Sequence, residues 1–149
     1  MKIIQAIGSG LIGALSLTLL HEITRRVVPE APRMDLLGMR ALSKSMRKLN
    51  VDPPSGKELF NLTMAGDLVS NALYYSLIGL GGKGKQAWLS GAVLGLAAGV
   101  GAVVLPSAMG LGSGPSRRTP ATALLTILLY LEGGMTAAAA YRLWTKSSM

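Results

Sequence analysis

The chain has 149 residues, of which 50% are hydrophobic and 15% are charged, and its formal net charge is +8. A soluble chain usually carries about a quarter charged residues, so this composition favours a membrane protein. Cysteine is absent and His21 is the single histidine. These counts exclude a disulfide framework, a catalytic thiolate and a metal centre built from several histidines, and we expect no cofactor or metal.

Four apolar segments are each long enough to cross about 30 Å of hydrocarbon as a helix. They are too long for soluble strands and lack the polar face of a soluble helix. We expect spans at residues 3–23, 59–81, 87–105 and 121–143, with Pro106 ending or kinking the third. The sequence therefore predicts an all-α integral membrane protein, a single domain over residues 1–149 built as a four-transmembrane-helix bundle.

The connection between the first two spans contains a further helix, expected over about residues 34–49. Met39, Leu42, Met46 and Leu49 recur on one face of this helix, and the opposite side is basic. Such a pattern is typical of an amphipathic helix that lies in the headgroup plane with its apolar side down. A solvated cap packed over the end of the bundle is the alternative. The residues expected to contact lipid headgroups are Arg33, Arg40, Lys44, Arg47 and Lys48.

Basic residues are unevenly distributed between the two ends of the predicted bundle. Eight of the fifteen Lys and Arg residues fall between Arg25 and Lys57, and Arg117 and Arg118 lie at the same end. Cytoplasmic loops carry an excess of such residues, so we expect residues 24–57 in the cytoplasm and both termini outside a cell membrane. The clustering favours a bilayer with anionic headgroups, and not nucleic acid, as the partner of this charge.

Glycine motifs are better explained by helix packing than by nucleotide binding. Residues 8–13 fit the pattern G-x-G-x-x-G, but a dinucleotide fold needs a run of parallel strands, and further membrane-length segments follow instead. In lipid, small residues spaced four apart let helices approach closely. The spacing leaves open whether such faces meet within one chain or in a homo-oligomer. The glycines expected at these faces are Gly91, Gly95, Gly99 and Gly10.

Two acidic residues, Asp67 and Glu132, lie near the middles of long apolar segments. A carboxylate at the centre of a bilayer costs about 2.5–3.5 kcal/mol on insertion scales, so it usually has a partner or a role. Counting about 1.5 Å per residue places the two at similar depth, where they could meet and share one proton. Glu132, which lies among leucines, should be protonated more often than Asp67, which belongs to a polar stripe.

Other polar residues complete the candidate site. Asn71 and Tyr74 share the face of Asp67, and His21 approaches from the first span if that helix continues. Glu22 is the weakest candidate, because Arg25 and Arg26 one turn later can pair with it. The candidate ligand- or ion-binding residues are Asp67, Glu132, Asn71, Tyr74, His21 and Glu22, and no catalytic residue is assigned.

Three classes of function remain open. In the first, the carboxylates bind or transport a proton, a cation or a small cationic or lipophilic solute. In the second, the chain is a non-catalytic membrane subunit that docks a partner through its glycine faces and basic helix. The third is a membrane enzyme acting on lipid, for which the sequence shows no nucleophile or metal motif. A purely structural alternative has Asp67 bonded to Asn71 and Tyr74, and Glu132 bonded to Thr136. We expect the first class.

Overall fold

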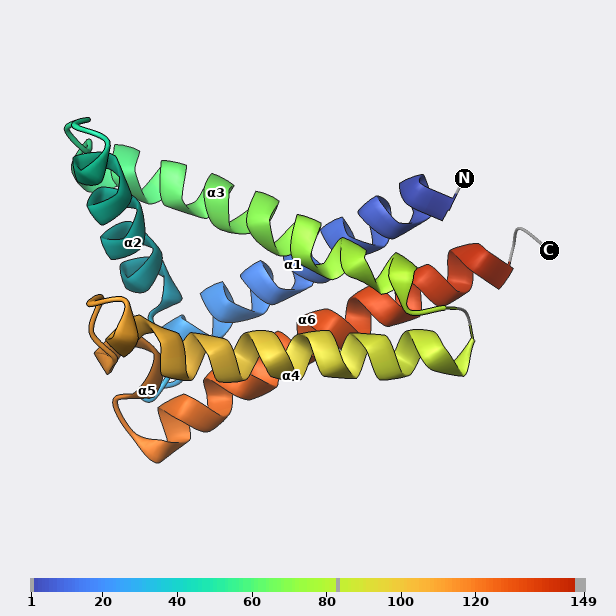
Figure 1. Ribbon diagram of the computed structural model, residues 1–149. Helices are drawn as coiled ribbons and strands as arrows, with labels where there is room; N and C mark the ends of the chain where they lie inside the picture. Colours follow the sequence, from blue (N-terminus) through green and yellow to red (C-terminus); the bar gives the residue numbers. More distant parts are fainter. Residues whose placement is uncertain (1, 83, 147–149) are drawn as a thin grey trace.

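The computed structural model describes residues 2–82 and 84–146, and these ranges contain helices but no strands (Figure 1). This excludes a dinucleotide-binding sheet around residues 8–13, which lie inside the first helix. The elements in chain order are α1 (Lys2–Val27), α2 (Met34–Lys48), α3 (Gly56–Ser76), the 3₁₀ helix η1 (Leu77–Leu80), α4 (Lys85–Ala108), α5 (Gly114–Arg117) and α6 (Pro120–Lys146).

Three of these helices are long and apolar enough to cross a membrane, namely Ile3–Val27, Lys85–Ala108 and Pro120–Lys146. They correspond to the first, third and fourth predicted spans and support a membrane protein. The predicted second span differs, because α3 is not among the three. Its charged and amide side chains lower its hydropathy, and the helix ends at Ser76, where η1 continues the segment.

The long helices pack in the order α3, α1, α6, α4. The closest pairs are α4 with α6, α1 with α3 and α1 with α6, whereas α3 and α4 have little direct contact. Figure 1 shows α3 and α4 leaving a common hairpin near both termini and diverging toward the opposite end. At that end α2 lies across the opening and contacts α3 and α5.

Helix α4 packs tightly on α6 through its glycines. Gly91, Gly95 and Gly99 are buried, and a Cβ atom added at Gly95 would lie only 2.7 Å from the Cα atom of Leu131. Gly10 of α1 approaches the backbone of α3 in a similar way. These glycine faces therefore meet other helices of the same chain, so they offer no free surface to a second protein. A homo-oligomer formed through other surfaces stays a prediction.

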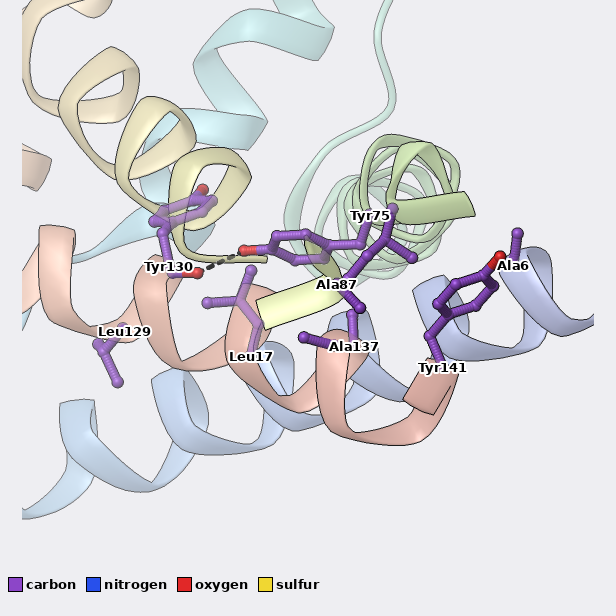
Figure 2. Packing of buried hydrophobic residues seen from close by; sticks show 10 residues of the cluster. Ala6, Leu17, Tyr75, Ala87, Leu129, Tyr130, Ala137 and Tyr141 are labelled. Atoms are coloured by element: carbon purple, nitrogen blue, oxygen red, sulfur yellow. Dashed lines mark hydrogen bonds between the residues drawn. The ribbon is translucent and has the colours of Figure 1, made fainter. Parts of the chain in front are cut away.

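Buried aromatic and small side chains hold α3 against the α1–α6 pair. Tyr75 is fully buried, and its hydroxyl donates a hydrogen bond of 2.7 Å to the main-chain carbonyl of Tyr130 (Figure 2). Leu17 of α1 and Ala137 of α6 are buried in the same cluster. This core fixes where α3 crosses α6, and it thereby positions the polar stripe of α3.

Two helix ends differ from the sequence-based expectation. Helix α1 continues to Val27, four residues beyond the predicted end. Helix α4 continues past Pro106 to Ala108, so the proline sits in the last turn and does not end the helix at residue 105. Because proline has no N–H group, the carbonyl four residues before Pro106 loses its usual helical hydrogen bond.

Helix α2 has a more complex environment than a helix lying free in the headgroup plane. Asp35 and Leu37 are buried, and Met39 and Met46 of the predicted apolar face are half-buried. Leu49, at the end of that face, is 75% exposed. Helix α2 therefore partly caps the open end of the bundle, which agrees with the alternative prediction of a cap for this segment.

Candidate functional site

Asp67 lies on α3 in the wall between two cavities. Met34, Asp67 and Tyr130 line both of them, so one carboxylate group can be approached from two sides. The side chains reach this point from α2, α3 and α6. The first cavity is small, and the second is a wide, mainly apolar groove.

The small cavity has a volume of about 20 Å³ and lies where α1, α2, α3 and α6 converge. Most of the residues that line it have a polar or charged side chain. The residues that line it are Thr18, His21, Glu22, Arg25, Pro32, Met34, Asp35, Thr63, Met64, Asp67 and Tyr130. Two of the predicted site residues on α1, His21 and Glu22, are thus brought next to Asp67.

Two of the three carboxylates at the small cavity have arginine partners. Arg25 donates hydrogen bonds of 2.8 and 2.6 Å to Glu22, which confirms the predicted pairing of that residue. Arg33 donates hydrogen bonds of 2.9 and 2.8 Å to Asp35. Within the described ranges, no Lys, Arg or His side chain forms a salt bridge with Asp67. Asp67 is therefore the carboxylate whose charge is not already matched.

The Arg33–Asp35 pair has a clear electrostatic consequence. Burial opposes ionisation of Asp35, but the hydrogen bonds and positive charge of Arg33 outweigh it and hold the pKa of Asp35 below its ordinary value. The same hydrogen bonds raise the pKa of the Arg33 guanidinium. The structure places Arg33 in an ion pair at the start of α2, and its contact with lipid headgroups stays a prediction.

His21 lines the small cavity, and one of its two ring nitrogens is a hydrogen-bond acceptor. Its Nδ1 atom lies 3.2 Å from the main-chain carbonyl of Leu17. Because a carbonyl can only accept, Nδ1 carries the proton of the neutral ring and Nε2 holds a lone pair. Nε2 is buried and has no hydrogen-bond partner among the residues that the structure describes. The ring also packs edge-on against Tyr130, with 5.6 Å between centroids.

The second cavity is a groove of about 580 Å³ between α3 and α4, closed at one end by α2. Its volume falls in the range of about 300–1,000 Å³ that is usual for small-molecule sites. Helix α3 contributes a polar wall, whereas α4 contributes small side chains that leave the space open. The α4 residues are Ala97, Ala98, Gly101, Ala102, Leu105, Pro106 and Met109.

The polar wall of the groove has three further members besides Asp67. The Ser70 hydroxyl donates to the carbonyl of Gly66 in its own helix at 2.8 Å. The Tyr74 hydroxyl donates to the carbonyl of Leu94 at 2.9 Å and so ties α3 to α4. Asn71, one turn after Asp67, interacts with that carboxylate, and its Nδ2 atom has no hydrogen bond of ordinary geometry.

Glu132 lies in different surroundings, between α1 and α6. Ser16 and Thr136 donate hydrogen bonds of 2.7 and 2.6 Å to its Oε1 atom, and its Oε2 atom is buried without a partner. Glu132 lines neither cavity that Asp67 borders. The structure therefore does not bring the two carboxylates into one site, and the bonds of Glu132 resemble the structural alternative. Preferential protonation of Glu132 stays a prediction.

The basic residues of α2 line a third cavity of about 730 Å³ beside the α4–α5 connection. Arg40 donates to the carbonyl of Leu111 at 3.0 Å, and Lys44 donates to the carbonyl of Met109 at 2.5 Å. Arg47 and Lys48 also line this cavity and are exposed. Four of the five predicted headgroup contacts thus lie together, over a floor that includes Leu36 and Leu59.

Sequence reasoning missed several residues of the site. Thr18 lies three positions before His21 on the same face of α1, and this spacing could have identified it. Asp35 lies in the first turn of α2, a common place for an acid, so its sequence position gave no sign of a site. Tyr130 and the small residues of α4 carried no signal of their own, because they belong to the site only through the way the helices cross.

Comparison with protein-family models, with curated proteins and with solved structures finds no match to this chain.

Proposed function

We propose that this chain is a four-span membrane protein that binds a small lipophilic cation in the α3–α4 groove. Asp67 is the counter-ion, and the cation exchanges with a proton on its carboxyl group. One observation carries the proposal: within the described ranges Asp67 has no ion-pair partner, and it borders a groove of about 580 Å³ with mainly apolar walls.

The electrostatics of this position favour a cationic ligand. An isolated carboxylate in a poorly hydrated site is costly, so it either takes up a proton or pairs with a cation. A lipophilic cation satisfies both parts of the groove, because its charge pairs with Asp67 while its apolar groups cover the alanines of α4. Proton and ligand then compete for one carboxylate group, which makes binding weaker as the pH is lowered.

A membrane-spanning α3 is part of this proposal. Its 21 residues correspond to a length of about 32 Å at a rise of about 1.5 Å per residue, close to the hydrocarbon thickness. Polar residues within a span normally face the interior of a bundle or a cavity. Asp67, Asn71 and Tyr74 line the groove, so α3 can cross without presenting them to lipid.

The proposal also places the α2 end of the molecule at the cytoplasmic surface. Helices α2 and α5 lie at the end opposite both termini (Figure 1). Arg40, Lys44, Arg47 and Lys48 line a common cavity there, with chemistry suited to the phosphate of an anionic lipid headgroup. The apolar side chains Leu36 and Leu59 in the same cavity suit the start of an acyl chain.

The test measures binding of tetraphenylphosphonium to the purified protein in detergent by isothermal titration calorimetry. Asp67→Asn keeps the shape of the side chain but removes its charge, and we expect it to weaken binding about 30-fold, which corresponds to roughly 2 kcal/mol. Glu58→Gln is the matched control, because it removes a carboxylate from an exposed position of the same helix and should leave binding unchanged.

Tetraphenylborate provides a second control, since it has nearly the same size and shape as tetraphenylphosphonium but the opposite charge. We expect it not to bind in the groove. Equal affinity of the wild type and Asp67→Asn for tetraphenylphosphonium, or equal affinity of the wild type for the two ions, would contradict the proposal.

A further inference from the structure

Three buried polar atoms near Asp67 have no hydrogen-bond partner in the described part of the chain. They are Thr18 Oγ1, His21 Nε2 and Thr63 Oγ1, and all three residues line the small cavity of about 20 Å³. Buried polar groups without a protein partner are commonly satisfied by an internal water, which needs about 10–15 Å³ and two to four polar neighbours. The cavity meets both requirements.

The donors and acceptors around the cavity match those of one water molecule. A water can donate to His21 Nε2, whose lone pair is free because Nδ1 donates to Leu17. Its second proton can go to the Asp67 carboxylate, and its two lone pairs can accept from the hydroxyls of Thr18 and Thr63. We propose that the small cavity binds a single water molecule that links His21 to Asp67.

The other acids around the cavity leave Asp67 as the carboxyl group that the water can reach. The titratable and charged groups that line the cavity are Glu22 and Arg25 on α1, Asp35 on α2, Asp67 on α3 and Tyr130 on α6. Glu22 and Asp35 are already hydrogen-bonded to arginines. Because a hydroxyl group can donate or accept, the two threonines can hold the water whether Asp67 is a carboxylate or a carboxylic acid.

The water is tested by the sign of a stability change. Thr18→Val and Thr63→Val remove one hydroxyl each with little change in shape, and thermal unfolding is followed by circular dichroism in detergent. If the hydroxyls hold a water, each variant should lower Tm by about 2–4 °C, and the double variant should lose less than the sum, since both groups bind one molecule. Thr24→Val, on α1 outside the cavity lining, is the control.

A rise in Tm for either variant would overturn the proposed water, because a hydroxyl with no partner is better replaced by a methyl group. This result does not depend on ligand binding. The water can therefore fail while the proposed function stands, and it can hold while tetraphenylphosphonium fails to bind.

Discussion

Individual carboxylates in this chain differ in what balances their charge. Asp35 accepts two hydrogen bonds from Arg33, and Glu132 accepts two from neutral hydroxyls. Asp67 has neither arrangement in the described structure, and only it borders a groove large enough for a solute. Burial alone therefore does not separate a structural acid from a binding acid. The partners of each acid make the difference, and they support the proposed role of Asp67 as the binding acid.

The Arg33–Asp35 pair predicts a specific loss of stability in acid. The pKa of Asp35 is held below its ordinary value in the folded state. The ion pair therefore stabilises the folded protein at any pH above the pKa of Asp35 in the unfolded chain, which is about 4. It is lost as the pH falls through the lower folded value. We expect Asp35→Asn to cost about 1–3 kcal/mol at neutral pH, with the difference from wild type shrinking below about pH 4.

Thermal unfolding across a pH series in detergent measures this difference. Asp52→Asn is the control, because Asp52 is exposed and its replacement should change little at any pH. A gap between wild type and Asp35→Asn that stays constant into strong acid would show that the ion pair is not its source.

The sequence identifies Asp67 and the groups on its own helix, because a charge within an apolar segment is visible without any structure. It does not identify Thr18 or Tyr130 as neighbours of Asp67. The predicted meeting of Asp67 and Glu132 rested on equal depth in the membrane, and depth says nothing about direction around the helix axis. In the structure, Glu132 accepts a hydrogen bond from Ser16, whereas Asp67 lines the two cavities.

At the scale of helices, the shape of the groove follows from how α4 distributes its small residues. Gly91, Gly95 and Gly99 lie against α6 and bring the two backbones close together. Ala97, Ala98, Gly101 and Ala102 instead line the groove. One helix thus combines a tightly packed face with an open face, and α3 cannot fill the space because the hairpin holds only its other end near α4 (Figure 1).

The packed face of α4 makes a second prediction about stability. A Cβ atom at Gly95 would lie 2.7 Å from Leu131 Cα and 2.8 Å from the carbonyl oxygen of Tyr130, so Gly95→Ala should force α4 and α6 apart. We expect a loss of about 1–3 kcal/mol. Gly66→Ala is the matched control, because nothing lies within 4 Å of a Cβ there, and it should gain up to about 1 kcal/mol.

Thermal unfolding and light scattering in detergent separate the two interpretations of these glycines. If Gly95→Ala changed the oligomeric state while the stability of the monomer stayed at the wild-type level, the glycine face would belong to an interface between copies. The internal packing seen here would then be contradicted.

Local sequence patterns predict where helices lie along the chain, but they do not predict which helices pack against each other. Apolar run length located α1, α4 and α6 within a few residues, and the basic–apolar pattern located α2 from Met34 onward. Helix α1 runs past residue 23 because Arg25 neutralises Glu22 within the same helix, so the charged turn adds stability. The predicted apolar face of α2 omitted Leu37, which is buried, because the cap is defined by α3 and α5.

At the scale of the whole molecule, the two ends have different characters. The end with α2 and α5 carries ten of the fifteen basic residues, and α2 closes the groove at this end. The opposite end holds the termini and the tight α3–α4 hairpin. A solute bound at Asp67 therefore lies nearer the basic end, and the excess of Lys and Arg predicts that this end faces the cytoplasm.

The number of spans and their orientation can be tested together, because the chain has no cysteine. Ser45 on α2 and Gln86 at the hairpin are both exposed, and Ser45→Cys and Gln86→Cys each introduce a single reactive thiol. A membrane-impermeant maleimide is added to intact cells and, separately, to permeabilised cells, in which both positions should react.

If α3 spans the membrane, the two thiols lie on opposite sides. We expect Gln86→Cys to react in intact cells and Ser45→Cys to react only after permeabilisation. If α3 stays on one side, both positions share a compartment, and matching labelling would contradict the four-span arrangement on which access to Asp67 depends.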